Sequence, residues 1–349
     1  MRRRDLLALV PATAIAAALA ACSSGGTASD GASGAAPSSA ASGSGGAAGG
    51  AFPATVQTKF GAVTIESAPQ RVVALGWGDA ETALALGVQP VGASDWLAFG
   101  GEGVGPWAAG LYTTAPTIIE TLEPSYEAIA ALRPDLILDT KSSGDQARYE
   151  RLSQIAPTVG VPTGGDSYLT TTRQQMELVS TALGKQAEGQ QLLEGLRAGF
   201  EQAAADHPQW KGRTATVATK TSNGWGAYVA APGGDGSDPL GGRVEFMEAL
   251  GFQQNPKIAA LPANSGGFSV DVSTEQLDLL DADVVVAFPI FIPTTDITGD
   301  AAWNALPAVT AEHALVIDGD TSSAFSLGTT LATQYALEQL VPQLETVSP

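Results

Sequence analysis

Short apolar runs alternate with segments of helical periodicity from about residue 71 to the end of the chain. The runs are rich in Val, Ile and Leu and predict buried strands, whereas the longer segments repeat apolar side chains at helical spacing. Strands are predicted at 71–75, 90–92, 136–138, 215–218, 284–286 and 315–317, and helices at 79–86, before 136, and at 170–183, 187–205, 244–250 and 330–344. This alternation is typical of an α/β fold, in which helices cover both faces of a mostly parallel sheet.

A long helix divides the pattern into two halves. Residues 170–183 contain neither Gly nor Pro, place Met176, Val179 and Leu183 at helical spacing, and are followed by Gly184, which is a typical helix stop. The strand and helix alternation begins again at residue 215. The chain therefore predicts one α/β unit, a connecting helix and a second α/β unit.

An internal repeat supports two units of like construction. Residues 125–138 align without gaps on residues 273–286, and four of the fourteen positions are identical. Each copy predicts a serine N-cap, a glutamate in the first turn, a short helix, and an aspartate that leads into a buried strand. Glu127 and Glu275 occupy the equivalent first-turn position, where an acidic side chain also interacts favourably with the helix dipole.

The first residues have the pattern of an export signal. Three arginines precede an uncharged apolar run, 6–21, which is short for a bilayer span and suits a signal peptide. The run closes on Leu19-Ala20-Ala21-Cys22, which resembles a lipoprotein cleavage box, in which the cysteine is lipidated. Two acyl chains hold a protein at a membrane. Residues 3–7 also resemble a twin-arginine signal, so both export routes stay open.

A Gly, Ala and Ser tract follows Cys22. From 23 to 51 the exceptions are Thr27, Asp30 and Pro37, and such a composition cannot bury enough apolar surface to fold. We therefore expect a flexible tether. Its root-mean-square span is about 30 Å by the scaling of Gly-rich chains.

The net charge and the counts of cysteine and histidine exclude several classes of function. The chain has 349 residues and a net charge of −19, which disfavours nucleic acid as a partner. Its single cysteine excludes an internal disulfide, and two histidines far apart, His207 and His313, cannot build a zinc or manganese site. No cofactor or metal site is expected.

Several segments together resemble one protein family. The segments are 71–75 (RVVAL), 86–92 (LGVQPVG), 123–137 (EPSYEAIAALRPDLI) and 152–159 (LSQIAPTV). In this order they are similar to the signature segments of the solute-binding lipoproteins of ABC importers for iron–siderophores and cobalamin. The resemblance covers about residues 56 to 345.

The resemblance implies an architecture and a function. It implies two Rossmann-like lobes joined by a single long rigid helix, with the ligand between the lobes and little closure on binding. The expected parts are a signal peptide (1–21), a lipidated Cys22 with tether (22–55), an N-terminal lobe (56–166), a connecting helix (167–185) and a C-terminal lobe (186–349). The implied function is capture of an iron(III)–siderophore by a monomer anchored at the outer face of the cytoplasmic membrane.

The resemblance also implies a docking role for the repeated glutamates. In the family, one glutamate on each lobe docks into arginine pockets of the membrane permease, and the matching positions here are Glu127 and Glu275. The connecting helix corresponds to 170–183.

Ligand contacts are expected where predicted strands end, because open α/β sheets bind ligands at that edge. A siderophore already coordinates its iron, so aromatic walls and a few polar groups suffice. The candidates are Trp77, Trp96, Trp225, Phe268, Phe291 and Phe325, with Lys141, Ser142, Ser143 and Arg243 as polar contacts. Core packing is expected for Trp107 and Trp303.

Other functions stay open on the sequence. Gly76-Trp77-Gly78 followed by Glu81 superficially suggests a dinucleotide fingerprint, but Glu81 stands where the third glycine belongs. An exported cofactor-binding oxidoreductase is therefore an alternative, as is a binding protein for heme or cobalamin. An anchored hydrolase is disfavoured because the folded region lacks a Gly-x-Ser-x-Gly elbow and a His-Glu-x-x-His motif.

Overall fold

The computed structural model describes residues 51–165, 167–230, 240, 242–264 and 267–348. Cys22, the expected signal peptide and most of the expected tether lie outside these residues. Contacts divide the chain into a unit that ends at Ala48 and a unit from Gly49 to Pro349, which holds every element described below. No helix in the described ranges is long and apolar enough to cross a bilayer.

A hairpin precedes the first predicted strand. β1 (Ala54–Thr58) and β2 (Gly61–Ile65) pair antiparallel, and β1 packs on a later helix, α4 (Thr172–Ala182). In β1, buried and exposed residues alternate, as expected of a strand with one face on the core. The sequence analysis placed no strand here.

The first sheet is parallel and has five strands in the order β5-β4-β3-β6-β7. Its central strands are fully buried, which explains their continuous apolar runs. The predicted strand at 90–92 is found two residues later. The elements are β3 (Val72–Ala74), α1 (Asp79–Ala85), β4 (Gly92–Ser94), η1 (Pro106–Ala108), β5 (Thr117–Ile119), α2 (Tyr126–Ala131), β6 (Leu136–Leu138), α3 (Gln146–Ser153) and β7 (Thr158–Val159).

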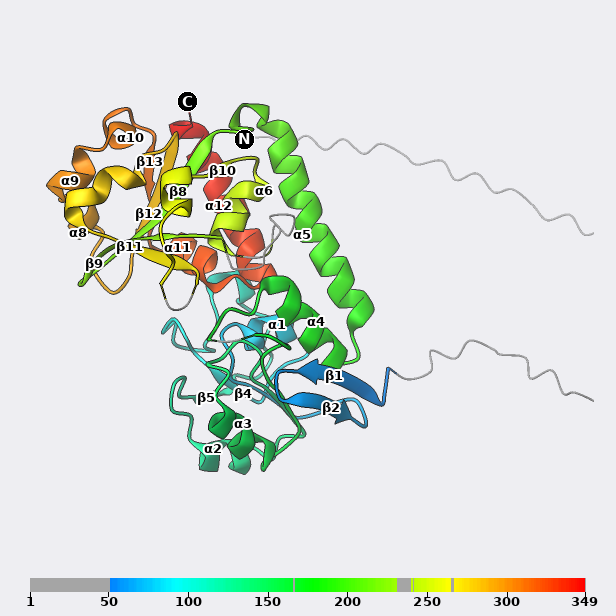
Figure 1. The fold of residues 1–349 in the computed structure, drawn as a ribbon. Helices are drawn as coiled ribbons and strands as arrows, with labels where there is room; N and C mark the ends of the chain where they lie inside the picture. Colours follow the sequence, from blue (N-terminus) through cyan, green and yellow to red (C-terminus); the bar gives the residue numbers. More distant parts are fainter. Residues whose placement is uncertain (1–50, 166, 231–239, 241, 265–266, 349) are drawn as a thin grey trace, which may run out of the picture. The chain divides into compact units, whose positions relative to one another are not determined.

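Two helices follow the first sheet. The predicted helix 170–183 is confirmed as α4, which begins with a capping box between Thr171 and Gln174. The longer helix is α5 (Gln186–Asp206), with 21 residues. It packs on α4, on α6 (Arg243–Ala249) and on the last helix, α12 (Thr330–Val347), and Figure 1 shows it beside α4 and α12.

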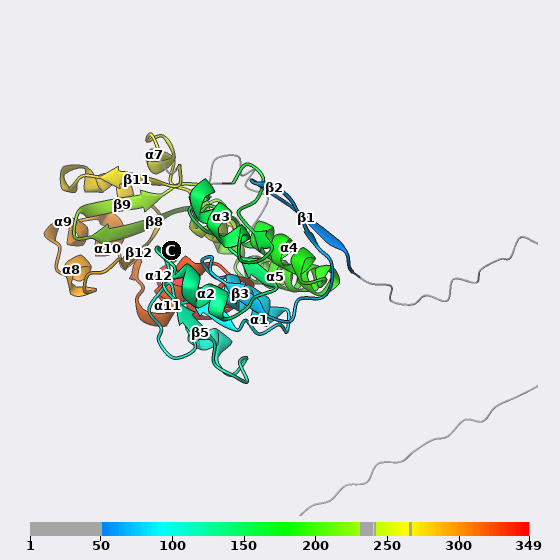
Figure 2. The same cartoon turned by 90° about the horizontal axis from the view of Figure 1, so that it is seen from below.

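The second sheet is mixed, with the order β11-β9-β8-β12-β13 and β10 paired to β8. β8, β10, β12 and β13 are parallel, β9 is antiparallel to β8, and β11 is antiparallel to β9; Figure 2 shows β8, β9 and β11 side by side. The elements are η2 (Pro208–Trp210), β8 (Thr214–Thr221), β9 (Gly224–Tyr228), α6 (Arg243–Ala249), β10 (Gln253–Gln254), α7 (Pro256–Ala259), β11 (Ser269–Val272), η3 (Thr274–Leu280), β12 (Val284–Pro289), α8 (Thr295–Thr298), α9 (Ala301–Asn304), α10 (Pro307–Thr310), β13 (Ala314–Val316) and α11 (Gly319–Leu327).

One apolar core runs from the first sheet to the second. It joins Val72 of β3, Met176 of α4, Phe200 of α5, Val217 of β8 and Leu340 of α12 in a single cluster of buried side chains. Burial of these side chains stabilises each by about 1.5–3 kcal/mol relative to exposure. The helices α4, α5 and α12 therefore share core with both sheets.

The sequence repeat is only partly a structural repeat. Ser125 caps α2 by accepting the Ala128 N–H at 3.2 Å, as expected. The Ser273 side chain accepts no such bond, and its segment is the 3₁₀ helix η3, with a kink at Gln276, instead of an α-helix. The expected serine cap is therefore wrong in the second copy, and the expected short helix is present as a kinked 3₁₀ helix.

The two aspartates of the repeat, Asp135 and Asp283, do have the same structural role. Asp135 accepts the Gln70 and Arg71 N–H groups at 2.8 Å, just before β3, and Asp283 accepts the Thr214 N–H at 2.7 Å, at the start of β8. Each carboxylate therefore ties the beginning of one parallel strand to the segment that enters its neighbour.

Candidate functional site

A cavity of about 480 Å³ is lined by residues that follow or end strands of both sheets. Trp77 follows β3 and Lys141 follows β6, while Ile290 follows β12 and Tyr228 ends β9. Residues of α4, α6, α11 and α12 complete its wall. Its size is that of a pocket for a drug-sized ligand.

Aromatic side chains form much of the wall. Tyr228 lies between Phe268 and Phe288, with ring centroids 6.2 and 5.8 Å away, and Phe325 meets Phe288 edge to face at 6.2 Å. Tyr228, Phe268 and Phe325 line the cavity directly. Such rings cover the carbon framework of a ligand and leave its polar atoms to other groups.

Two cationic side chains line the same cavity. Lys141 Nζ lies 3.3 Å from the Leu327 carbonyl, and Arg243 Nη2 lies 3.3 Å from the Ser326 carbonyl. The Arg243 guanidinium also lies over the Tyr228 ring, 4.4 Å from its centroid. Burial, reinforced by the neighbouring Arg243, lowers the pKa of Lys141 to about 8, and Asp79 opposes this shift.

A buried carboxylate holds the loops that carry Trp77 and Lys141. Asp79 accepts the N–H groups of Gly76 at 3.0 Å and Thr140 at 2.9 Å, and also the Thr140 hydroxyl. The Trp77 N–H donates to the Lys141 carbonyl at 2.8 Å. Burial raises the pKa of Asp79 to about 6, although these donors act against the shift.

Helix α4 joins this arrangement through one amide. Gln175 Nε2 donates to Asp79 Oδ1 at 2.8 Å and to the Trp77 carbonyl at 2.9 Å. Residues of α4 thereby fix the loop that follows β3.

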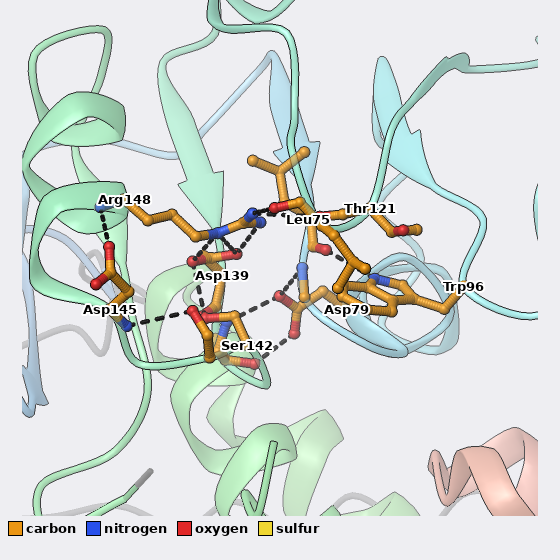
Figure 3. A network of polar contacts seen from close by, with 12 residues as sticks. Leu75, Asp79, Trp96, Thr121, Asp139, Ser142, Asp145 and Arg148 are labelled. Carbon is orange, nitrogen blue, oxygen red and sulfur yellow. Dashed lines mark hydrogen bonds and ion pairs between the residues drawn. The ribbon is translucent and has the colours of Figure 1, made fainter. Parts of the chain in front are cut away.

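A second buried network lies behind the β6 loop (Figure 3). The Arg148 guanidinium forms an ion pair with Asp139 at 2.9 Å and donates to the carbonyls of Thr121 and Leu122. The Ser142 hydroxyl donates to Asp139 Oδ2 at 2.9 Å. The structure therefore places Ser142 in this network and not on the cavity wall.

The glycines around Trp77 have a packing role. A Cβ atom on Gly76 would lie 2.3 Å from Asp79 Oδ2, and one on Gly78, where φ is +81°, would lie 2.4 Å from the Thr329 side chain. Glu81 is also buried and accepts hydrogen bonds from Trp107 and Thr329. These contacts explain the Gly-Trp-Gly pattern without a pyrophosphate.

Five of the predicted ligand contacts do line the cavity, namely Trp77, Lys141, Arg243, Phe268 and Phe325. Trp96 lies behind them: its ring stacks on Trp77 at 5.7 Å and its Nε1 donates to the Leu75 carbonyl at 2.9 Å. It supports the wall without forming it.

Two predicted aromatics lie elsewhere. Trp225 is buried in a different cluster, where it stacks on Trp303 at 5.3 Å and donates to Asp300. Trp225 and Tyr228 stand three positions apart on β9, so they point to opposite faces of the strand, and the cavity is on the Tyr228 face. Phe291 follows Ile290 with a φ of +55° and is fully exposed.

The sequence analysis missed several wall residues. Tyr228 could have been found by recognising the strand 224–228, but Tyr168, Thr172 and Glu245 carry no such local signal. Glu245, on α6, is a buried carboxylate.

Glu127 and Glu275 are both exposed in the first turns of α2 and η3, and neither lines the cavity. Trp303, expected in the core, is buried. Within the described residues, no group of three His, Cys, Asp or Glu side chains is placed to hold a metal ion.

Comparison with known proteins finds a matching family and several related proteins. The periplasmic binding protein family matches residues 72–321. The Fe(3+) dicitrate-binding periplasmic protein FecB of Escherichia coli (strain K12) is 33% identical over 159 residues, which are 46% of this chain and 52% of that protein. The probable siderophore-binding lipoprotein YfiY of Bacillus subtilis (strain 168) is 28% identical over 274 residues, 73% of this chain and 76% of its own length.

A solved structure matches the fold over most of the chain. The periplasmic solute binding protein from Mycobacterium smegmatis superimposes with a TM-score of 0.71 at 27% identity, covering 84% of this chain and 98% of its own. The α/β fold predicted from the sequence is therefore confirmed.

Proposed function

Because the chain belongs to the periplasmic binding protein family, we propose that it is the solute-binding component of an ABC importer and captures an iron(III)–siderophore. The observation that carries this proposal is the cavity of about 480 Å³, whose wall combines Tyr228, Phe268 and Phe325 with the cations Lys141 and Arg243. A chelate brings its iron already coordinated, so the protein needs an apolar wall and a few polar contacts.

The names of two relatives point to the same ligand class. FecB is described as binding Fe(3+) dicitrate, and YfiY as a probable siderophore-binding lipoprotein. Both descriptions concern ferric chelates, which supports the same cargo for this chain.

In this proposal each sheet belongs to one lobe and the ligand binds between the lobes. Residues 56–166 and 186–349 would form the lobes, and 167–185, which contains α4, the connecting helix. The continuous core that α4, α5 and α12 share with both sheets supports a small closure, because a packed core resists large rearrangement.

Delivery to a permease is assigned to Glu127 and Glu275. Both carboxylates are exposed, as a docking contact requires. Arginine–carboxylate pairs at two separate points fix orientation as well as contact. The chain is proposed to act as a monomer, held by a lipid on Cys22 at the outer face of the cytoplasmic membrane.

Tryptophan fluorescence tests the proposed function. Trp77 lines the cavity and stacks on Trp96, so ferric siderophore binding should quench emission in a saturable manner. The panel includes ferric siderophores of several classes, heme and cobalamin. Saturable binding of heme or cobalamin alone would contradict the proposal.

A further inference from the structure

We propose that the cavity selects ferric chelates of net negative charge, whose outer oxygen atoms are bound by Lys141, Arg243 and the Trp77 indole. This inference rests on the proposed function and narrows its ligand class. It excludes neutral hydroxamate chelates as the preferred cargo.

The first observation is a pair of cations without carboxylate partners. Among the described residues, neither Lys141 nor Arg243 forms an ion pair. Each donates to a backbone carbonyl, of Leu327 and Ser326 respectively, and Arg243 also lies over the Tyr228 ring. Both side chains are half-buried, and charges that are partly removed from water are normally paired, because desolvation is costly. An anion in the cavity would supply the missing partner.

The charges around Lys141 and Arg243 strengthen this observation. The whole chain carries a net charge of −19, yet among the described residues that line the cavity Lys141 and Arg243 are accompanied by one carboxylate, Glu245. The three described charged residues of the wall therefore sum to +1 at neutral pH. Arg243 also lowers the pKa of Lys141, which means that the two cations repel each other when no anion lies between them.

The second observation is a pair of unused hydrogen-bond donors. Trp77 Nε1 and Arg243 Nε are buried and have no acceptor in the described structure. Buried polar atoms nearly always have a partner. Indole, guanidinium and ammonium groups donate and cannot accept, so together with Lys141 they require a ligand rich in acceptor oxygens.

The two observations favour an anionic chelate over a neutral one. A neutral hydroxamate complex would satisfy the donors but leave both charges without a counter-charge. Carboxylate or catecholate oxygens would satisfy both requirements, since charge-assisted hydrogen bonds are about twice as strong as neutral ones. The rings of Tyr228 and Phe268 remain available for the carbon framework.

Calorimetric titration of the full chain, purified in detergent, tests the inference. The anionic probes are ferric citrate, ferric staphyloferrin B and a ferric tris-catecholate, the neutral probe is ferrichrome, and iron-free citrate tests the need for iron. We expect the best anionic chelate to bind at least about tenfold more tightly than ferrichrome, as one charge-assisted bond provides.

Variants of the cavity wall then test whether the charge or the shape of the ligand determines its affinity. Lys141→Met and Arg243→Gln should each weaken binding of the best anionic chelate by about ten- to hundred-fold and reduce its preference over ferrichrome, since both ligands lose a hydrogen bond but only the anion also loses the attraction between opposite charges. Lys257→Met removes an exposed lysine with the same change in net charge, and should leave both affinities unchanged.

Two results would overturn the inference while leaving the proposed function intact. One is ferrichrome binding as tightly as any anionic chelate to the unmodified chain, which needs no variant. The other is an equal loss of affinity for anionic chelates and for ferrichrome in a folded Lys141→Met or Arg243→Gln variant. Failure to bind every ferric chelate would instead overturn the proposed function, and this inference with it.

Discussion

At the scale of single residues, the site depends on how Trp77 and Lys141 are held. Their loops are joined by one backbone hydrogen bond and by Asp79, whose carboxylate accepts from both loops. The side chains therefore reach the cavity from a rigid base. A preformed wall reduces the ordering cost of binding.

Replacement of Trp77 should weaken ligand binding. Trp77→Ala removes an apolar contact of about 1–3 kcal/mol, which corresponds to a roughly ten- to hundred-fold rise in Kd. Trp77→Phe keeps the aromatic wall but removes Nε1, so its effect should be smaller, about tenfold or less. Calorimetry measures both variants after circular dichroism has shown them folded, and unchanged affinity in Trp77→Ala would assign this residue to structure alone.

The affinity for an anionic chelate should depend on the charge of Lys141. Its pKa is about 8 in the ligand-free protein, and a bound anion favours the ammonium form. Affinity should therefore be constant below pH 8 and fall by up to about tenfold per pH unit above it. The neighbouring carboxylate Asp79, with a pKa of about 6, is already ionised in this range.

Titrations at pH 7, 8, 9 and 9.5 measure this dependence. In Lys141→Met the affinity should be lower at pH 7 and nearly flat with pH. An equally steep decline in that variant would assign the titration to another group.

At the scale of elements, individual carboxylates tie strands and helices together. Asp135 and Asp283 hold the beginnings of β3 and β8, and Asp139 is paired with Arg148 of α3. Hydrogen bonding from Thr214, the leading favourable cause, lowers the pKa of Asp283. The stabilisation by Asp283 is therefore present above about pH 4, the ordinary aspartate value, and is lost as pH falls through the lowered pKa.

Removal of the Arg148 charge should destabilise the fold strongly. Arg148→Met leaves Asp139, which is 3% exposed, without its cation, and breaking a buried pair in this way costs about 3–5 kcal/mol. Urea unfolding followed by circular dichroism measures the loss. The exposed Arg197→Met is the control and should change stability by less than about 0.5 kcal/mol; a cost below about 1 kcal/mol for Arg148→Met would contradict the prediction.

At the scale of the whole molecule, the proposed lipid on Cys22 predicts attachment to the membrane. The described helices supply no membrane span. Cys22→Ser should therefore move the protein from the membrane fraction to the soluble fraction, because two acyl chains provide the anchor. Sedimentation after an alkaline wash measures this. Ser24→Ala, two residues away, should leave the protein on the membrane, and a Cys22→Ser variant that still sediments would refute the lipid anchor.

Replacement of the repeated glutamates should separate permease docking from ligand binding. Because Glu127 and Glu275 are exposed and lie outside the cavity wall, the double alanine variant should keep its siderophore affinity but lose uptake. Each change should cost less than about 1 kcal/mol of stability, as expected for a first-turn glutamate. Uptake of radiolabelled iron by whole cells measures transport.

The control for this variant removes two other exposed carboxylates. Glu66 and Glu194 are exposed, and their replacement by alanine gives the same net charge. Uptake should then be normal. Normal uptake in the Glu127 and Glu275 double variant would leave these residues with a helix-dipole role only, and a loss of ligand affinity would place them in ligand binding.

The sequence alone determined most of the α/β pattern and five of the cavity residues. Strands such as 72–74 and 136–138 could be predicted because both of their faces are buried, which gives each a continuous apolar run. Helix ends could be predicted from local signals such as Gly184. Trp77 and Lys141 could be placed at the site because parallel strands end on one edge of a sheet.

Tertiary structure alone decided which side chains reach the cavity. Trp225 and Tyr228 share β9, but the sheet face that meets the cavity depends on pairing with β8 and β11. Ser142 is drawn into the Asp139 network, and the backbone at Phe291 turns that side chain to solvent. The physical reason is that periodicity states which residues share a face, whereas partners distant in sequence decide what each face contacts.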